Sequence, residues 1–225
     1  MSSSLQIVRE TEHWIALNKP AGQSVEGLNL PFLTLEQAVR NYLPNGYLGV
    51  VHRIDRPTSG LVIMAKKKSA HRHLQQQFEK RLIRKDYLAV TQYPLPQKAD
   101  TLQQWHRKSA DRKKALITDQ PVKDSKEARL WFRKVAESDG QALVQVRLFT
   151  GRYHQIRAQF AQMGCPLIND QLYGANKQTE DIAIALHAWR LQFGNPSDGA
   201  RISLAAPTPE SALWPASWQS LSDLP

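Results

Sequence analysis

A single carboxylate between two cations, Asp55 with Arg53 and Arg56, is the feature of this sequence most suited to chemistry. It lies in residues 51–60 (VHRIDRPTSG), directly before the apolar run 61–65. Nearby positive charge favours the ionised form of a carboxyl group, so Asp55 is expected to be a carboxylate at neutral pH. Such a group can serve as a nucleophile, a general base or an anchor for an ion pair. The alternative is that Asp55 caps a turn while both arginines are solvated.

The residues after Asp55 are suited to holding it rigidly in front of a buried strand. Pro57 restricts the residue before it to extended geometry, and Gly60 permits a backbone conformation that other residues avoid. The run 61–65 (LVIMA) is apolar throughout, as expected of a short buried strand. The segment can therefore be rigid without regular secondary structure.

Periodicity and turn signals predict a mixture of strands and helices over the rest of the chain. Strands of uneven spacing with scattered helices favour an α+β domain over a regular βαβ repeat. The stretch 93–124 is polar, proline-containing and weakly periodic, so it is predicted to be a loop or a flexible basic insertion. The expected strands are 5–8, 14–17, 61–65, 129–135, 142–148, 185–193 and 201–204, with a hairpin turn at 138–140. The expected helices begin at Thr34 with a capping box to Gln37, begin at a Ser69 cap, and cover 154–163 before Gly164.

The overall charge indicates a polyanionic partner. The chain has 225 residues, of which 41% are hydrophobic, and a formal net charge of +10. Lysine and arginine gain affinity for nucleic acid by releasing counterions condensed on phosphates. An acidic membrane is the competing partner, but we find no strongly amphipathic basic helix, no apolar run near the roughly 20 residues of a spanning helix and no leader segment. We therefore expect a cytoplasmic protein that binds nucleic acid and not membrane. The single cysteine, Cys165, excludes an internal disulfide.

Four sequence blocks occur in an informative order. They lie at residues 18–22 (NKPAG), 51–60 (VHRIDRPTSG), 85–90 (KDYLAV) and 150–157 (TGRYHQIR, continued to residue 174), with smaller matches at 186–188 (LHA) and 205–207 (AAP). The second block resembles the HR(L/I)D-x-x-TSG signature of the RluA family of pseudouridine synthases. The other blocks resemble that family's NKP-(A/S)-G element, its tyrosine-containing strand and its TGR-x-HQ(I/L)R…GD-x-x-YG block. The likeness spans most of the chain.

The resemblance implies a fold, an activity and a partner. The implied fold is the pseudouridine synthase fold, a mixed, mostly antiparallel sheet with flanking helices and a central RNA-binding cleft. The implied enzyme is an isomerase that converts a specific uridine of tRNA or ribosomal RNA into pseudouridine without a cofactor or a metal. Family members often begin with an S4 RNA-binding module, whereas this sequence starts at the catalytic region. Residues 1–225 are thus expected to be a single catalytic domain, acting as a monomer.

The family's roles carry over to the matching positions. Asp55 corresponds to the catalytic aspartate, Tyr87 to the tyrosine that stacks on the target uracil, and Arg157 to the basic residue that pairs with the aspartate carboxylate. The alternatives for Tyr87 and Arg157 are an ordinary strand aromatic and a helix-surface cation. Ile156 is the neighbouring apolar wall. Arg53 resembles the arginine that fills the place of an extruded base, because an enzyme acting on a base within structured RNA must flip it out.

Further RNA contacts are expected from basic residues near these blocks. The expected RNA-binding side chains are Arg56, Lys66, Lys67, Arg84 and the basic group at 107–114. A charge run is more often a solvated face, but acids are scarce in these stretches. Where the family has I-x-GD, this chain has Asn169 before Asp170, and the turn is expected to survive because Asn tolerates left-handed geometry.

Several alternatives remain open on the sequence alone. Asp55 could add to C6 of uracil, attack C1′, or remove a proton from the sugar. The protein could be a catalytically silent RNA-binding or chaperone protein on the same scaffold, or an Asp-dependent nucleoside hydrolase. The intact set of Asp55, Tyr87 and Arg157 speaks against the silent protein, and the charge of +10 speaks against small substrates. The RPTSG form at 56–60 resembles tRNA-acting relatives such as the TruC group, which hints at tRNA.

Overall fold

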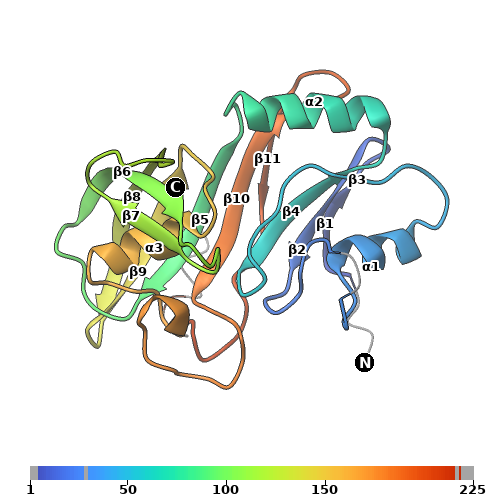
Figure 1. Cartoon of the computed structure of the whole chain (residues 1–225). Coiled ribbons are helices and arrows are strands. Elements are labelled where there is room, and N and C mark those ends of the chain that lie inside the picture. Colours follow the sequence, from blue (N-terminus) through green and yellow to red (C-terminus); the bar gives the residue numbers. More distant parts are fainter. Residues whose placement is uncertain (1–4, 28–29, 216–217, 219–225) are drawn as a thin grey trace. The chain divides into compact units, whose positions relative to one another are not determined.

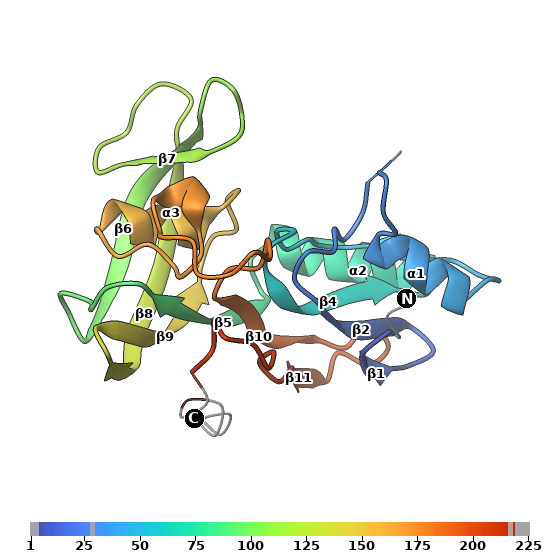
Figure 2. The ribbon, with the colours of Figure 1, turned by 90° about the horizontal axis from the view of Figure 1, so that it is seen from below.

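The computed structural model describes residues 5–27, 30–215 and 218, and the contacts of the chain divide it into two compact units. Unit 1 consists of residues 1–85 and 187–209, and unit 2 of residues 86–186 and 210–225. Each unit combines strands with helices (Figures 1 and 2), which confirms the predicted α+β class. None of the helices within the described ranges is long and apolar enough to cross a membrane.

Unit 1 is built around a fully buried central strand. Its elements are β1 (Ile7–Glu10), β2 (Trp14–Lys19), α1 (Leu35–Tyr42), β3 (Gly49–Val50), β4 (Ser59–Ala65), α2 (Lys68–Glu79), β10 (Leu186–Gly194) and β11 (Arg201–Ala205). The strand order is β1-β2-β4-β10, with β3 beside β4 and β11 beside β10. Strand β4 runs parallel to β10 and antiparallel to β2 and β3. Every residue of β4 is buried, which explains why its sequence is apolar rather than alternating.

The core of unit 1 lies between these strands and α2. Leu61 and Ile63 of β4 pack with Leu74 of α2 in one buried cluster. Trp14 of β2 meets Phe193 of β10 edge to face, with ring centroids 5.2 Å apart. Figure 2 shows α1 and α2 on the same side of the strands. Burial of each such side chain contributes about 1.5–3 kcal/mol, so this core fixes β4, the strand into which the Asp55 turn leads.

Unit 2 is a mainly antiparallel sheet with one helix packed on it. Its elements are β5 (Arg84–Thr91), β6 (Ala99–Lys108), β7 (Ala115–Thr118), β8 (Lys126–Ser138), β9 (Gln141–Leu148), α3 (Gln155–Gln162) and the 3-10 helix η1 (Gln171–Tyr173). The strand order is β5-β9-β8-β6-β7. Phe160 of α3 packs on Phe132 of β8 with ring centroids 5.6 Å apart, and both are fully buried. This contact fixes the helix that carries Arg157.

Three predictions that depended on local signals are confirmed. Thr34 and Gln37 form the reciprocal capping box at the start of α1. Strands β8 and β9 are joined by Asp139 and Gly140, whose φ angles of 52° and 73° suit a two-residue hairpin turn. Helix α3 ends before Gly164, which has a φ of 76°.

Two local predictions are wrong. The stretch 93–124 is not a single loop, because residues 99–108 and 115–118 form β6 and β7, which pair antiparallel from Trp105 to Thr118. Strand β6 is exposed or half-buried along nearly its whole length, so its residues are polar and its periodicity is weak. Helix α2 begins at Lys68, one residue before the expected Ser69 cap, and its N-cap residue Lys67 makes no side-chain cap.

Candidate active site

Asp55 stands at the start of a turn that leads directly into β4. The amide of Thr58 donates a hydrogen bond to the Asp55 carbonyl oxygen at 3.0 Å, and the strand begins at the next residue. Asp55 is half-buried, whereas Arg56 is exposed. A main-chain turn thus presents the carboxylate at the start of a fully buried strand, in agreement with the sequence prediction.

The buried ammonium group of Lys19 ties this turn to the first sequence block. Its Nζ donates to the carbonyl oxygens of Pro20 at 2.8 Å, Gln23 at 2.7 Å and Arg56 at 3.3 Å. Gly22 adds a reciprocal pair: its amide donates to the Arg56 carbonyl oxygen, and its own carbonyl oxygen accepts from Arg56 Nε, both at 2.8 Å. The first two blocks, which are some 30 residues apart in the chain, therefore form one rigid loop pair.

Burial strongly affects the charge of Lys19. Removal from water lowers the pKa of Lys19 from 10.5 to about 7, while the Asp55 carboxylate opposes this shift and the Arg56 guanidinium adds to it. The carboxylate of Asp55 therefore helps to keep this ammonium charged. Sequence reasoning gave Lys19 no role of its own, because nothing in the pattern indicated that its side chain would be buried.

Replacing Lys19 by methionine is expected to change how stability depends on pH. Between pH 7 and 10.5 the unfolded chain binds more protons at Lys19 than the folded chain does, because the folded pKa is the lower one. The free energy of unfolding of the wild type, relative to Lys19→Met, should therefore rise with pH across this window, by an amount on the order of a few kcal/mol. Urea unfolding at several pH values measures it. Lys68→Met, at an exposed position, should give a flat difference, and a flat difference for Lys19→Met would contradict the expectation.

The start of β4 allows no side chain at Gly60 and fixes Ser59 through a histidine. Gly60 has a φ of 112°, and a Cβ there would lie 2.4 Å from the Ala188 carbonyl oxygen. His187 Nε2 donates to the Ala206 carbonyl oxygen at 3.1 Å, so Nδ1 accepts from the Ser59 hydroxyl at 2.9 Å. Burial lowers the pKa of His187 to about 4, which keeps the ring neutral. The TSG, LHA and AAP matches therefore meet in one buried cluster.

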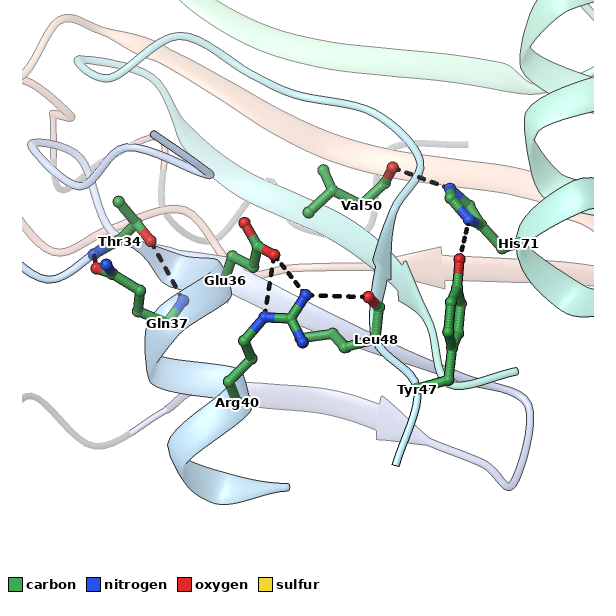
Figure 3. A network of polar contacts seen from close by, with 8 residues as sticks. All are labelled: Thr34, Glu36, Gln37, Arg40, Tyr47, Leu48, Val50 and His71. Atoms are coloured by element: carbon green, nitrogen blue, oxygen red, sulfur yellow. Dashed lines mark hydrogen bonds and ion pairs between the residues drawn. The ribbon is translucent and has the colours of Figure 1, made fainter. Parts of the chain in front are cut away.

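The other end of the segment 51–60, which carries Asp55, is held by strand β3, which directly precedes it (Figure 3). Arg40 of α1 donates to the Leu48 carbonyl oxygen at 3.3 Å and pairs with a glutamate one helical turn earlier. His71 of α2 contacts the Val50 carbonyl oxygen at 3.2 Å through Nε2 and the Tyr47 hydroxyl through Nδ1. The segment that carries Asp55 is thus fixed from both helices of unit 1 as well as from β4.

Three of the cations expected to contact RNA are paired with carboxylates on unit 1. The pairs are Arg53 with Glu26 at 2.9 Å, Lys66 with Glu10, and Lys67 with Glu12. The Arg53 side chain is 69% exposed, and an exposed pair of this kind contributes only about 0–1 kcal/mol, so it can be exchanged for a phosphate. Lys66 also donates to the Thr11 carbonyl oxygen at 2.9 Å, which ties it to the β1–β2 turn.

Arg157 lies on α3 in unit 2 and forms a buried bidentate ion pair with Asp170. Its Nε and Nη2 donate to the two carboxylate oxygens at 2.7 and 2.8 Å, and the Tyr173 ring lies 5.1 Å from the guanidinium. The Arg157 and Asp170 side chains are 5% and 1% exposed. The alternative of a helix-surface cation is therefore wrong. Sequence reasoning missed Asp170 as a partner, although it occupies the GD position of the fourth block.

A chain of buried amides fixes the start of α3. Gln155 Oε1 accepts from the Thr150 hydroxyl at 2.8 Å and from the Arg152 amide at 3.0 Å. Its Nε2 donates to Gln159 Oε1 at 3.0 Å. His154, just before the helix, has a φ of 52°, a conformation that few residues other than glycine adopt. The first residues of the fourth block thus set the direction of the helix that bears Arg157.

Asn169 does more than preserve the turn expected of it. Its φ is 65°, so the prediction of left-handed geometry is confirmed. Its Nδ2 also donates to the carbonyl oxygens of Ala183 at 2.7 Å and Asp181 at 3.1 Å, and its Oδ1 accepts from the Gln178 amide at 2.8 Å. Glycine could adopt the angle but could not supply these bonds. Asn169 therefore also orders the loop that follows η1.

The remaining predicted residues are distributed over both units. Arg84 begins β5 in unit 1, whereas Tyr87 of β5 and Ile156 of α3 belong to unit 2. Tyr87 is half-buried against the unit 2 core, of which Ile156 is a member. Its neighbour Asp86 is buried and pairs with Arg147 at 2.9 Å. Across the described ranges, no three His, Cys, Asp or Glu side chains are grouped so that they could hold a metal ion.

This fold is one seen in RNA pseudouridylate synthases. The solved structure of human RNA pseudouridylate synthase domain containing 1 matches with a TM-score of 0.78 over 92% of this chain and 84% of that one, at 24% identity. Human RNA pseudouridylate synthase domain containing 4 matches with a TM-score of 0.73 at 20% identity, covering 91% and 89%. At these identities the likeness concerns the fold.

Sequence comparison gives the family. A family model described as RNA pseudouridylate synthase matches residues 13–162. The chain belongs to this family, which confirms the membership that the four blocks indicated. It is 31% identical to ribosomal large subunit pseudouridine synthase D of Nitrosomonas europaea over 98% of the chain, and 35% identical to ribosomal large subunit pseudouridine synthase C of Vibrio cholerae over 89%. It spans 66% and 65% of the lengths of these two relatives.

Proposed function

We propose that this protein is an RNA pseudouridine synthase, an isomerase that converts a uridine of structured RNA into pseudouridine. The observation that carries the proposal is the fixed Asp55 turn, which joins the first two family blocks through Lys19 and enters β4 at Gly60. A carboxylate held in this way can act on a bound nucleotide without reorganising first. We further propose a single catalytic domain that acts as a monomer in the cytoplasm.

The reaction rearranges bonds without redox change or net hydrolysis. The N1–C1′ bond of uridine breaks, the uracil rotates and C5 joins C1′; the hydrogen of C5 leaves as a proton, and N1 takes up a proton. Asp55 is the proposed catalytic residue, through addition to C6, attack at C1′, or removal of a sugar proton. Tyr87 is proposed to stack on the uracil, and Arg157 to pair with the Asp55 carboxylate. Arg53 is proposed to take the place of the extruded base.

Ribosomal RNA is the first substrate to test, and tRNA is the second. The relatives from Nitrosomonas europaea and Vibrio cholerae are named for the ribosomal large subunit, which favours rRNA. The RPTSG form at 56–60 gives the weaker hint of tRNA. The net charge of +10 supports either polyanion.

The basic tip of the β6–β7 hairpin, residues 107–114, is proposed as the main site that binds RNA phosphates. Its cations are Arg107, Lys108, Arg112, Lys113 and Lys114, and none of the five forms an ion pair with a residue that the structure describes. Lys108 Nζ lies 4.8 Å from the Tyr153 ring, and the Tyr153 hydroxyl donates to the Lys113 carbonyl oxygen at 3.3 Å. His106 Nε2 donates to the Tyr153 carbonyl oxygen at 2.8 Å. The hairpin is therefore anchored on the fourth block, next to α3.

Removing two charges from this tip should weaken RNA binding in a salt-dependent way. In Arg112→Gln/Lys113→Gln, two phosphate contacts are lost, so the slope of log affinity against log salt should fall by about 1–2. Filter binding of ribosomal RNA at several salt concentrations measures the slope. Lys134→Gln is the matched control, because that ammonium is already paired with Glu137 in the same unit. An equal decrease of the slope in the control, or no decrease in the tip variant, would contradict phosphate binding by the hairpin tip.

Tritium release from RNA that contains 5-tritiated uridine tests the proposed function. Isomerisation expels the C5 hydrogen, so the purified protein should release tritium from ribosomal RNA or tRNA and leave carbodiimide-reactive pseudouridine. Abasic sites without pseudouridine would indicate a hydrolase instead. Binding of RNA with neither product would indicate the silent RNA-binding protein and refute the proposal.

A further inference from the structure

A groove on unit 1 lies beside the catalytic segment and takes no part in the chemistry above. Its volume is about 410 Å³, within the range of small-ligand sites. It is formed by the loop before α1 and by the side of that helix, and its lining residues are Leu30, Pro31, Phe32, Leu33, Gln37 and Asn41. The groove is thus small and open, and it is built from one loop and the helix that directly follows it.

Arg56 connects this groove to the catalytic carboxylate. Its guanidinium lies over the Phe32 ring, 4.3 Å from the centroid, and its Nε donates to the Gly22 carbonyl oxygen. The Arg56 carbonyl oxygen accepts from Lys19 and Gly22, so the main chain at this residue is fixed too. Because Arg56 directly follows Asp55, the groove begins next to the residue proposed to attack the uridine. A nucleotide adjoining that uridine in the RNA strand is therefore the occupant to consider.

The lining of the groove suits a nucleobase. None of the six lining residues carries a charge, and Leu30 and Leu33 are 38% and 52% exposed. Phe32 supplies an aromatic ring, and Asn41 supplies an exposed amide with donors and an acceptor. The capping box uses Gln37 Oε1, so Nε2 is the atom that this side chain can offer to a ligand. Proteins that bind single-stranded RNA stack bases on aromatic and arginine planes and read their edges with such groups.

We propose that the groove holds an unstacked nucleobase next to the modified uridine, and so helps to select the substrate. The proposal rests on the proposed function, since it takes the occupant to be part of the same RNA. The positive charge of Arg56 at the edge of the groove complements the phosphate that links the two nucleotides. The apolar and amide lining receives the base itself. Phe32 is then a binding residue and not a catalytic one.

Photo-cross-linking with cellular RNA that carries 4-thiouridine tests this inference. After irradiation, peptides joined to a nucleotide are mapped by mass spectrometry. Cross-links within residues 30–41 of the wild type are expected, and in Phe32→Leu they should fall about 5-fold or more, as loss of one base-stacking contact predicts. Phe32→Trp should retain them. Leu82→Ala is the matched control, because Leu82 is 62% exposed, belongs to unit 1 and lies outside the groove. Thermal unfolding checks that each variant is folded.

The outcomes separate the groove from the activity. Three results would each refute the proposal that the groove binds a nucleobase. They are cross-links that map only outside residues 30–41, no cross-links at all, and an equal signal from the wild type and Phe32→Leu. Tritium release by the same wild-type preparation reports independently on the proposed function. Tritium release without cross-links in the groove would support the proposed synthase activity and refute the proposed base-binding groove. Cross-links in the groove without tritium release would support a binding site for RNA bases and refute the proposed synthase activity.

Discussion

Asp55→Ala and Asp55→Asn should both release no measurable tritium from RNA that the wild type modifies. Every route open to this carboxylate needs its negative charge or its lone pairs, and the amide of Asn offers neither a comparable nucleophile nor a base. Loss of a positioned general base alone costs about 10²–10⁴-fold in rate, and loss of a nucleophile costs at least as much. Single-turnover tritium release with excess enzyme measures the effect without interference from product release.

Two controls show whether the loss is chemical. Both variants should still bind RNA within a few-fold of the wild type, and both should unfold cooperatively, because the turn is held by main-chain bonds and by Lys19. Glu26→Gln is the matched carboxylate-to-amide change on the same unit, and it should keep its activity because it removes only an exposed ion pair with Arg53. Activity in Asp55→Asn within 10-fold of the wild type would refute the role of this residue.

Asp170→Asn should cause the largest loss of stability among single changes near the fourth block. The substitution keeps the shape of the side chain but removes the negative charge that receives Nε and Nη2 of the buried Arg157 guanidinium, and breaking such a pair costs about 3–5 kcal/mol. Guanidinium chloride unfolding measures it. Glu180→Gln offers the matched control, since Glu180 pairs with Lys177 but its side chain is 91% exposed, so its loss should cost under about 1 kcal/mol.

Asp170 should also influence catalysis by positioning Arg157. At a temperature where both proteins are folded, the single-turnover rate of Asp170→Asn should fall while its affinity for RNA changes little. Arg157→Lys should show the same pattern, because a lysine cannot make the two parallel bonds to Asp170. A stability loss no larger than that of Glu180→Gln would show that this pair is not what orders the helix.

The sequence predicted those parts of the fold that depend on neighbours in the chain. The capping box of Thr34 and the Asp139-Gly140 turn are signals spread over a few residues, and their physics is local. The β6–β7 hairpin escaped prediction because its strands bury few side chains, so apolar periodicity, the main strand signal, is weak there.

The candidate site was predictable only where a family block carries it. Asp55, Tyr87 and Arg157 were identified by resemblance, and the structure adds contacts of Lys19 and Asp170, two residues that the blocks contain without indicating their partners. Asp170 lies 13 residues from Arg157, and the carbonyl oxygens around Lys19 come from two separate loops. Burial decides whether such side chains are solvated or paired, and burial depends on contacts between distant parts of the chain.

The hydrogen bonds from Ser59 through His187 to Ala206 have a consequence for biosynthesis. A ribosome makes the Asp55 turn first and supplies the histidine and its carbonyl partner only more than 100 residues later. Strand β10, which leaves no room for a side chain at Gly60, arrives equally late. Unit 1 is therefore completed only by residues 187–209, and a nascent chain halted before them carries Asp55 in a unit that still lacks most of β10 and all of β11.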